Sequence, residues 1–530
     1  MKFKPIRLTL EKFFKGAFVA LLAMFAVACD DSTTVTSAVV TSDPFDPNKP
    51  ILITGFTPET GGYQEDIIVK GQNFGNDKSA LTLKIGGKTA VVINVMSDKL
   101  YAFVPSGAFS GEVEITITDE SGNEYKAVAD KKFEYVRKTV VGTLCGYQNE
   151  NDDQGQLFGS FDECCGFNME GCFTFDPLYP DRLYVVYDGG GGSFIGELDL
   201  EKRTYNRLMT SNKFQNERLR NAAFTLDGEY MLVSTDRGGG DNQRHSTSVW
   251  IVKRNSDGTF SDSSNSQPLV AYKQCNGVAV HPINGEIYFN SYEGGQLFRM
   301  ELQDYFDAKS GKPDADGNVP EEWTGYFEDG AFTELFKIKD PGYEFQVTIH
   351  PTGKYAYLTV INRHYILRSD YDEEKKEFTT PYVVAGADGQ AGWFDAVGTN
   401  ARLDRPYQGV FVKNPEYEAE GREDVYDYYY CDNHGWCVRY ITPDGLVRTY
   451  AGRSPSTNGN IWGTEDGGLR DQARFRDVSG IAYDEKREMF YVLDNNNRRV
   501  RTIGKEAEEP VVDEPTDEPT EEPSEEPSVE

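Results

Sequence analysis

The chain is short of positive charge. Its 530 residues include 54 Lys and Arg against 86 Asp and Glu, which gives a formal net charge of -32. A nucleic-acid-binding protein needs a basic face to neutralise phosphates, so this balance argues against that class of function. Histidine is also scarce, with 5 in the chain, and no CxxC motif occurs. We therefore expect neither a nucleic-acid partner nor a metal centre.

Long apolar runs are lacking too, and the one candidate covers residues 13–28. It is too short for a comfortable membrane span of about 20 residues. It follows several basic residues and ends just before Cys29, a pattern typical of a secretory signal. The alternatives are a lipoprotein signal peptide over residues 1–28 and an ordinary cleaved signal with a free cysteine nearby.

The segment FAVAC, residues 25–29, resembles a bacterial lipobox, although Ala26 stands where leucine is usual. The resemblance implies acylation of Cys29 and attachment to a membrane by a lipid anchor only. Asp30 and Asp31 resemble the acidic export tag of surface lipoproteins in Gram-negative bacteria. We therefore expect the protein in the outer membrane, with its folded part at the cell surface.

Two segments lack the apolar content that a packed core requires. Residues 29–50 are rich in Ser, Thr, Asp and Pro, which predicts a flexible tether. Residues 505–530 repeat an acidic, proline-rich unit with almost no apolar residues, which predicts a disordered tail.

Seven cysteines follow Cys29, and an exported protein is expected to pair them as disulfides. Cys431 and Cys437 enclose a short loop and form the best single candidate pair. The group Cys145, Cys164, Cys165 and Cys172 can pair in more than one way. The odd number leaves one thiol unpaired.

Residues 51–136 contain short β-type runs separated by Gly and Pro, which indicates a β-sandwich. The segment resembles the immunoglobulin-like TIG (IPT) domain, and its matching positions are Pro58, Gly61, Gly62, Gly71, Asn73, Phe74, Gly75, Gly86, Gly87, Ala90, Val104, Pro105 and Gly111. The resemblance implies a spacer or interaction module without catalytic residues. Phe56 and Phe74 are expected in its core.

Residues 139–504 contain an internal repeat of β-type runs. Six copies start at Cys172, Ala222, Gly277, Gln346, Gly409 and Gly480. Their spacing predicts a six-bladed β-propeller, so the fold class is all-β, with a sandwich followed by a propeller. The last copy, with its lead-in from residue 463, resembles the NHL repeat, and the lead-in to the fifth copy is similar.

The repeat also predicts how the ring closes. The last copy ends at Ile503 without the glycine-terminated outer strand that precedes other copies, and TVVGTLCG at 139–146 has that form. We expect residues 139–144 to supply the outer strand of the sixth blade, which removes exposed strand edges. His281 and His350 stand at equivalent repeat positions to Asp176, Asn414 and Asp484, so a structural turn role is favoured over metal ligation.

Loops between the second and third strands, and those leading into the first strand, gather on one face of a propeller. The candidate ligand-binding residues on these loops are Arg237, Tyr292, Phe345, Gln346, Arg363, His364, Trp393, Tyr407, Gln408, Asn433, His434, Trp436, Trp462 and Asn496. Amides, charged groups and aromatic rings suit a polysaccharide or oligosaccharide. Many Asn and Gly residues in turns serve the backbone alone, which is the structural alternative.

The leading hypothesis is a non-catalytic surface lipoprotein that binds a glycan through one propeller face, with the TIG domain as spacer. Outer-membrane uptake proteins are possible partners. One alternative is a protein-interaction scaffold at the outer membrane, and another is a metal-dependent lyase or hydrolase on the propeller. No cofactor is expected, although the Asp and Asn run at 494–497 could bind calcium.

Overall fold

The computed structural model describes residues 42–105, 107–147, 155–188, 192–236, 247–271, 274–291, 294–309, 332–338, 344–456 and 459–506. Contacts divide the chain into two compact units. The first comprises residues up to Glu59, Asp66–Phe103 and Gly111–Phe133, and the second comprises the rest. No helix within the described ranges is both long enough and apolar enough to cross a membrane.

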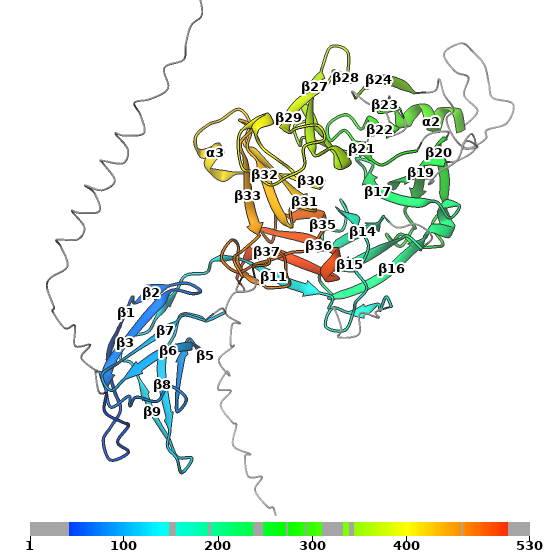
Figure 1. The fold of residues 1–530 in the computed structure, drawn as a ribbon. Coiled ribbons are helices and arrows are strands. Elements are labelled where there is room, and N and C mark those ends of the chain that lie inside the picture. The colour runs from blue at the N-terminus through cyan, green and yellow to red at the C-terminus, as the bar shows by residue number, and fades with distance from the viewer. Residues whose placement is uncertain are drawn as a thin grey trace, which may run out of the picture. The chain divides into compact units, whose positions relative to one another are not determined.

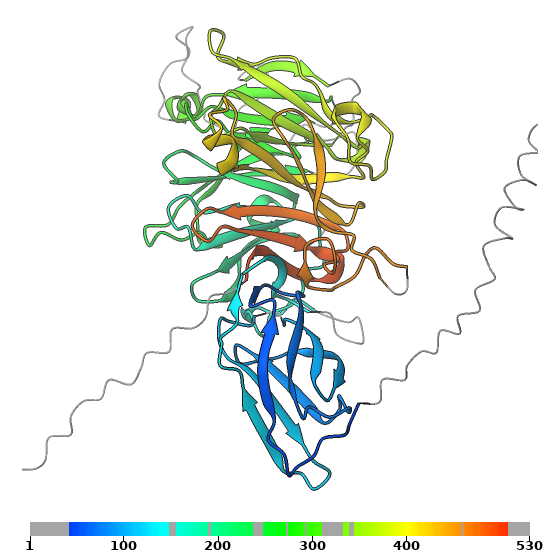
Figure 2. The ribbon, with the colours of Figure 1, turned by 90° about the vertical axis from the view of Figure 1, so that its left-hand side faces the viewer.

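The N-terminal domain is an antiparallel sandwich, drawn in blue and cyan in Figure 2. One antiparallel sheet has the order β1-β3-β7-β6 and a second has the order β5-β4-β8-β9, whereas the short strands β10 and β2 pair in parallel and are assigned by contacts to the second unit. The strands are β1 (Leu52–Thr57), β2 (Thr60–Gly61), β3 (Asp66–Gln72), β4 (Leu81–Ile85), β5 (Lys88–Thr89), β6 (Val91–Met96), β7 (Lys99–Phe103), β8 (Val113–Thr118), β9 (Glu124–Val128) and β10 (Glu134–Tyr135).

The core of this sandwich follows from the alternation of its strands. In β4, the side chains of Leu81, Leu83 and Ile85 are buried, while those between them are exposed. This period of two places one row of each strand between the sheets. Phe56 and Phe74 are also buried, as the sequence predicts.

The rest of the described chain forms six antiparallel sheets. Blade 1 comprises β12 (Gly159–Ser160), β13 (Gly171–Phe175), β14 (Arg182–Tyr187), β15 (Phe194–Asp199) and β16 (Thr204–Thr210), and blade 2 comprises β17 (Arg218–Phe224), β18 (Tyr230–Asp236), β19 (Thr247–Lys253) and β20 (Ser266–Ala271). Blade 3 comprises β21 (Val278–Val280), β22 (Ile287–Ser291), β23 (Gln296–Met300) and β24 (Thr333–Lys337). Blade 4 comprises β25 (Phe345–Ile349), β26 (Tyr355–Val360), β27 (Tyr365–Asp372), β28 (Glu377–Phe378) and β29 (Tyr382–Gly386).

The fifth blade contains β30 (Pro406–Lys413), β31 (Tyr426–Asp432), β32 (Cys437–Ile441) and β33 (Val447–Gly452), and the sixth contains β34 (Gly467–Gly468), β35 (Val478–Asp484), β36 (Met489–Asp494), β37 (Arg499–Lys505) and β11 (Thr139–Cys145). Short helices α2 (Leu302–Lys309) and α3 (Pro415–Ala419) and the 3-10 turns η1 (Ser211–Phe214), η2 (Ile361–Arg363), η3 (Gly398–Asn400) and η4 (Asn495–Asn497) connect strands.

The six sheets form a closed ring. The inner strand of each blade contacts the inner strand of the next, from β13 through β17, β21, β25, β30 and β35, and β35 contacts β13 again (Figure 1). Ring closure occurs in the sixth blade, where β11 pairs antiparallel with β37 over Thr139–Cys145. The predicted all-β propeller is confirmed, with six sheets in the ring among the described residues, and β11 takes the closing position that the sequence predicts for residues 139–144.

Three inner strands carry a β-bulge at the same place. The register shifts between Leu219 and Ala222 in β17, between Pro406 and Gly409 in β30, and between Val478 and Ile481 in β35. A bulge adds one residue and changes the direction of the side chains within it. In β17 and β30 these residues include Arg220 and Tyr407, whose side chains both contact Asp188 of blade 1.

The cysteines correct a prediction. Cys431 and Cys437 are separate buried thiols, as are the other five described cysteines. The register explains this, because Cys431 lies opposite Val438 and Cys437 lies opposite Asp432. Neighbouring positions on a strand point to opposite sides of the sheet, so the two sulfur atoms cannot meet. The predicted Cys431–Cys437 disulfide is therefore wrong, and the predicted lipidation site, Cys29, lies outside the described residues.

Candidate functional site

Polar side chains gather at one end of the propeller. Because the strands are antiparallel, the loop between the second and third strands lies at the same end of a blade as the start of its inner strand. The side chains that meet there belong to Glu170, Asp188, Arg218, Arg220, Asp236, Glu344, Asn362, Arg405, Tyr407 and Asn433, and we call them the axial network.

Arg220 is the centre of this network and is 1% exposed. Its Nη1 atom lies 3.2 Å from Asp188 Oδ2 and 3.5 Å from Asp236 Oδ2, and its Nη2 atom donates to Glu344. Asp188 also accepts a hydrogen bond of 2.7 Å from the Tyr407 hydroxyl. A buried cation is stable only when such partners replace its water. Arg220 thereby joins groups from blades 1, 2, 4 and 5.

Arg405 forms a second centre. Its guanidinium donates to both carboxylate oxygens of Glu170, at 2.9 Å for Oε2, and to Asn433 Oδ1 at 2.9 Å. Its backbone N–H donates to His364 Nδ1 at 3.0 Å. The remaining ring nitrogen of His364 therefore carries the proton, and burial lowers the pKa of this histidine. His364 acts here as a neutral acceptor that positions Arg405.

Four buried polar side chains near this end have atoms without a partner among the described residues. They are Arg220 Nε, Asp236 Oδ1, Gln274 Oε1 and Asn276 Nδ2. The four side chains are between 0% and 3% exposed. Buried polar atoms are normally hydrogen-bonded, and exceptions point to water or to a ligand. All four belong to blades 2 and 3, and Asn495 Oδ1, in the loop between the second and third strands of blade 6, is also buried without a partner among the described residues.

The chemistry of this end favours hydrogen bonding over covalent catalysis. Cys172 accepts a hydrogen bond of 3.4 Å from the Gln346 amide. Burial raises the pKa of the Cys172 thiol, so it stays protonated and is a poor nucleophile. Burial likewise raises the pKa of Asp236. Within the described ranges, no three His, Cys, Asp or Glu side chains are grouped so that they could hold a metal ion.

The structure brings together four of the predicted site residues, Gln346, His364, Tyr407 and Asn433, in or beside the axial network. Two further predictions need correction. Phe345 is fully buried in an apolar cluster with residues such as Tyr288 and Leu358, and cannot contact a ligand.

Gln408 has a structural role. Its Oε1 atom accepts from Phe173 N at 2.8 Å and Ile481 N at 3.0 Å, and its Nε2 atom donates to Phe173 O at 2.7 Å. The side chain therefore joins the inner strands of blades 1, 5 and 6. These bonds leave it little capacity for a ligand.

Other predicted residues lie around blades 5 and 6. Trp436 donates from its indole nitrogen to Asp477 Oδ1 at 3.0 Å, and Asn496 donates to the other oxygen of the same carboxylate. The Arg476 guanidinium lies 4.7 Å from the ring centroid of Trp462. Trp393 is 38% exposed. Trp436 and Trp462 lie in loops of blades 5 and 6, and Trp393 is bonded to Thr449 in β33, the outer strand of blade 5.

Arg363 and His434 complete the predicted set within the described residues. Arg363 donates to Asp388 at 2.7 Å, and His434 is half exposed with its ring near Asp404. Arg237 and Tyr292 lie outside the described residues.

The sequence reasoning missed the charged centre of the site. Arg220, Glu344 and Arg405 were not singled out, although a signal was present. The inner strand RLRNAAF places two arginines at alternate positions of a strand that otherwise faces the apolar interior. Charges at such positions require partners nearby.

The predicted calcium run has internal partners. Asp494 Oδ2 accepts from Arg501 at 2.9 Å and from Asn497 at 2.8 Å, and Asp494 Oδ1 accepts from Arg476 N at 2.8 Å. A calcium ion binds six to eight oxygen atoms. Both oxygens of Asp494 are already in use, which argues for a structural role of this run.

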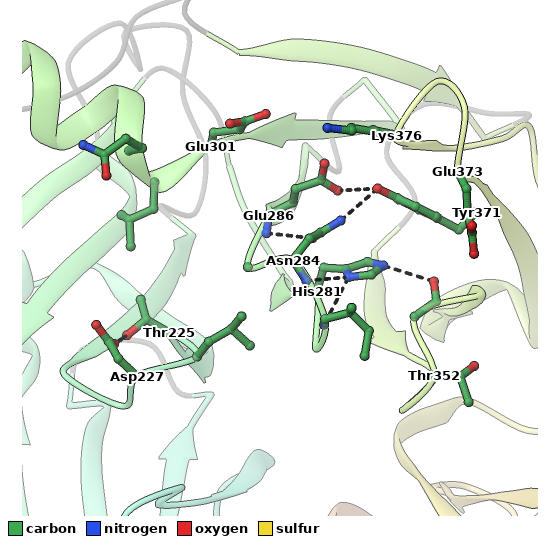
Figure 3. Close-up of a pocket in the computed structure, with 16 residues that line it drawn as sticks. Thr225, Asp227, His281, Asn284, Glu286, Glu301, Thr352, Tyr371, Glu373 and Lys376 are labelled. Carbon is green, nitrogen blue, oxygen red and sulfur yellow. Dashed lines mark hydrogen bonds between the residues drawn. The ribbon is translucent and has the colours of Figure 1, made fainter.

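A cavity of about 650 Å³, which we call the turn cavity, lies where the turns between first and second strands of blades 2 to 4 meet (Figure 3). Its polar groups are largely paired with one another. His281 Nε2 bonds to Gly353 O at 3.1 Å, and Glu286 accepts from Tyr288 at 2.6 Å and from Tyr371 at 3.0 Å. His281 thus has the predicted turn role. The axial end, with its unpartnered atoms, is the stronger candidate for ligand binding.

An immunoglobulin-like domain followed by a closed ring of six sheets defines a two-domain all-β protein. The family model described as IPT/TIG domain matches residues 50–135, which confirms the predicted TIG domain. No curated protein sequence matches the chain.

Several solved structures from Bacteroides match most of the chain. An auxiliary nutrient binding protein from Bacteroides thetaiotaomicron is 36% identical, with 88% of this chain and 100% of that chain covered and a TM-score of 0.74. One of the same description from Bacteroides ovatus is 34% identical, with 88% and 100% covered and a TM-score of 0.60. A candidate phosphatase from Bacteroides thetaiotaomicron is 50% identical, with 88% and 99% covered and a TM-score of 0.75. The chain belongs to the same family as these Bacteroides proteins.

Proposed function

We propose that the protein is a non-catalytic binding protein that takes up a glycan at the axial end of its propeller. The observation that carries the proposal is the set of four buried polar side chains with unpartnered atoms beside the axial network. Sugar hydroxyls both donate and accept hydrogen bonds. They can therefore supply the missing partners of a guanidinium, a carboxylate and two amides at the same time. The relatives described as auxiliary nutrient binding proteins support a binding role.

The charge of the axial network also fits a ligand held by hydrogen bonds. Arg218, Arg220 and Arg405 stand against four carboxylates, and the cations are already ion-paired within the chain. A site of nearly balanced charge does not depend on strong electrostatic attraction. It binds a ligand through directional hydrogen bonds, as polyhydroxyl compounds require.

We further propose that the protein is a lipoprotein of the outer membrane, with acylated Cys29 as its anchor and the propeller at the cell surface. The lipobox-like sequence before Cys29 supports this location. The TIG domain would then act as the spacer between membrane and propeller. Outer-membrane uptake proteins are the partners that would receive the bound glycan.

The test is an affinity-gel screen of the full chain, purified in detergent, against a panel of polysaccharides. The site variants are Asp236→Asn, which replaces one acceptor oxygen by a donor and removes the charge, and Gln274→Leu, which removes the amide while keeping a similar side-chain size. Asn284→Ala, in the turn cavity, is the matched control. We expect retention by at least one polysaccharide, a loss of about tenfold or more in the site variants, and no change in the control.

The same screen separates the alternative functions. Retention followed by shorter products would show a lyase or hydrolase, and release of inorganic phosphate from a phosphomonoester would show the activity attributed to the candidate phosphatase relative. Binding that is equal in both site variants and wild type would place the site elsewhere. An absence of glycan binding would favour the protein-interaction scaffold.

A further inference from the structure

The rim of blade 5 presents exposed aromatic side chains beside two arginines. Trp393 is 38% exposed and Phe394, next to it, is 59% exposed. The guanidinium carbon of Arg453 lies 4.2 Å from the centroid of the Trp393 ring, and that of Arg470 lies 5.8 Å from it. The indole N–H donates to Thr449 Oγ1 at 2.9 Å, which fixes the ring in place. We call Trp393, Phe394, Arg453 and Arg470 the rim cluster.

The two cations of the rim cluster have no carboxylate partner among the described residues. Arg453 donates from Nη1 to Gly435 O at 2.8 Å, and Arg470 contacts the Trp393 ring. By contrast, the buried Arg439 of the same blade binds two carboxylates. Arg453 is also half-buried, and its pKa is lowered by burial and by the neighbouring arginines.

These two arginines lie over the same ring in a chain with a net charge of -32. Two neighbouring cations repel each other, and one of them has lost part of its water. A chain with an excess of carboxylates nevertheless leaves both unpaired. An anion supplied from outside would remove the repulsion and replace the lost water, because a guanidinium offers a planar fork of donors to a carboxylate or sulfate.

The rim cluster is continuous with the axial network. Gly435, which accepts from Arg453, belongs to the same loop as Asn433, which accepts from Arg405. A ligand longer than one or two sugar rings could therefore occupy the axial end and extend over the rim. Aromatic rings at the rim would pack against the apolar face of a sugar.

We propose that the glycan is an acidic polysaccharide, and that Arg453 and Arg470 bind its carboxylate or sulfate groups while Trp393 packs against a sugar ring. The inference rests on the proposed function, because it names the class of glycan that the same propeller end would take. Trp393 was among the residues predicted from the sequence, whereas the two arginines were not.

The experiment compares matched polysaccharides that differ in charge. Polygalacturonate and its methyl-esterified form test carboxylates, and chondroitin sulfate and unsulfated chondroitin test sulfates. The full chain is compared with Arg453→Gln, Arg470→Gln and the double variant. Arg448→Gln is the matched control, because it removes the same charge from an exposed position in β33 of the same blade. Thermal unfolding confirms that each variant is folded.

We expect one charged polysaccharide to be retained more strongly than its matched form of lower charge. The double variant should lose about tenfold or more in affinity, and Arg448→Gln should lose little. Raising NaCl from about 0.05 to about 0.5 M should weaken wild-type binding more than binding by the double variant. The reason is that salt screens the ion pairs between the arginines and the ligand, which the double variant no longer forms.

Three results would overturn the inference. Retention of neutral polysaccharides alone, unchanged in the arginine variants, would leave the proposed function standing and remove the acidic class. Equal retention of polyglutamate, lost in the same variants, would show that the rim binds an acidic protein segment. A failure to bind any polysaccharide would overturn the proposed function together with this inference.

Discussion

Arg439 provides the sharpest test of how blade 5 holds the rim. Its side chain is fully buried and donates to Asp432 Oδ2 at 2.8 Å, Asp395 Oδ1 at 2.7 Å and Phe394 O at 3.0 Å. A fourth bond, of 2.7 Å, goes to Arg402 O. One guanidinium thus connects the third strand of the blade to the loop that carries Trp393 and Phe394.

Replacing Arg439 with Met removes these four bonds while keeping most of the side-chain volume. It also leaves Asp432, which is 0% exposed, as a buried carboxylate without its cation. Breaking a buried pair by removing one partner costs about 3–5 kcal/mol. We expect the propeller to lose that much unfolding free energy, measured by urea denaturation at pH 8. Arg448→Met, an exposed arginine of the same blade, is the control.

The loss should depend on pH in a direction that the structure fixes. Burial raises the pKa of Asp432 to about 6 even with Arg439 present, and removal of the cation raises it further. Because the folded state of the variant then binds this proton more tightly than the unfolded chain does, lowering the pH through the folded-state pKa restores stability. The difference from wild type should therefore be smaller at pH 5 than at pH 8.

A second substitution separates lost packing from the uncompensated charge. Asp432→Asn in the Arg439→Met background removes the unpaired carboxylate, so the double variant should be more stable than Arg439→Met at pH 8. A loss below about 1 kcal/mol in Arg439→Met, or no recovery in the double variant, would refute the reasoning. Tryptophan fluorescence in the folded state reports separately whether the Trp393 loop has moved.

The remaining predictions concern ring closure, the thiols and calcium. Val141→Asp should destabilise the propeller by about 3 kcal/mol or more in urea denaturation, because Val141 is buried in β11 against β37. Thr143→Ala, at an exposed position of the same strand, should lower the unfolding free energy far less. Equal losses in the two variants would contradict the ring closure. Alkylation of the denatured chain without reductant, followed by peptide mapping, should find Cys431 and Cys437 both alkylated, and a disulfide-linked peptide joining them would contradict the strand register. Chelation with EDTA should leave the midpoint of thermal unfolding unchanged, since the oxygens of Asp494 are bonded within the chain; a fall that added calcium reverses would show a site that we have not placed.

The sequence alone determined the fold class, the six repeats and the ring closure. These depend on alternation along single strands and on the spacing of similar units, which are local properties of a chain. The sequence also allowed the turn role of Asp176, His281 and Asp484 to be predicted. Each of these side chains accepts a hydrogen bond from a backbone N–H group two or three residues further on. Such bonds lie within one turn and need no distant partner.

Only the tertiary structure decided which residues form the site. Phe345 and Gln346 are neighbours in sequence, yet the first lies in the core between blades and the second reaches Cys172 in blade 1. Arg220 meets Asp188 and Glu344, from blades 1 and 4, because the β17 bulge directs it and because the ring brings those blades together. Contacts between residues so far apart in sequence depend on ring closure and on strand register, so no local pattern in the chain could reveal them.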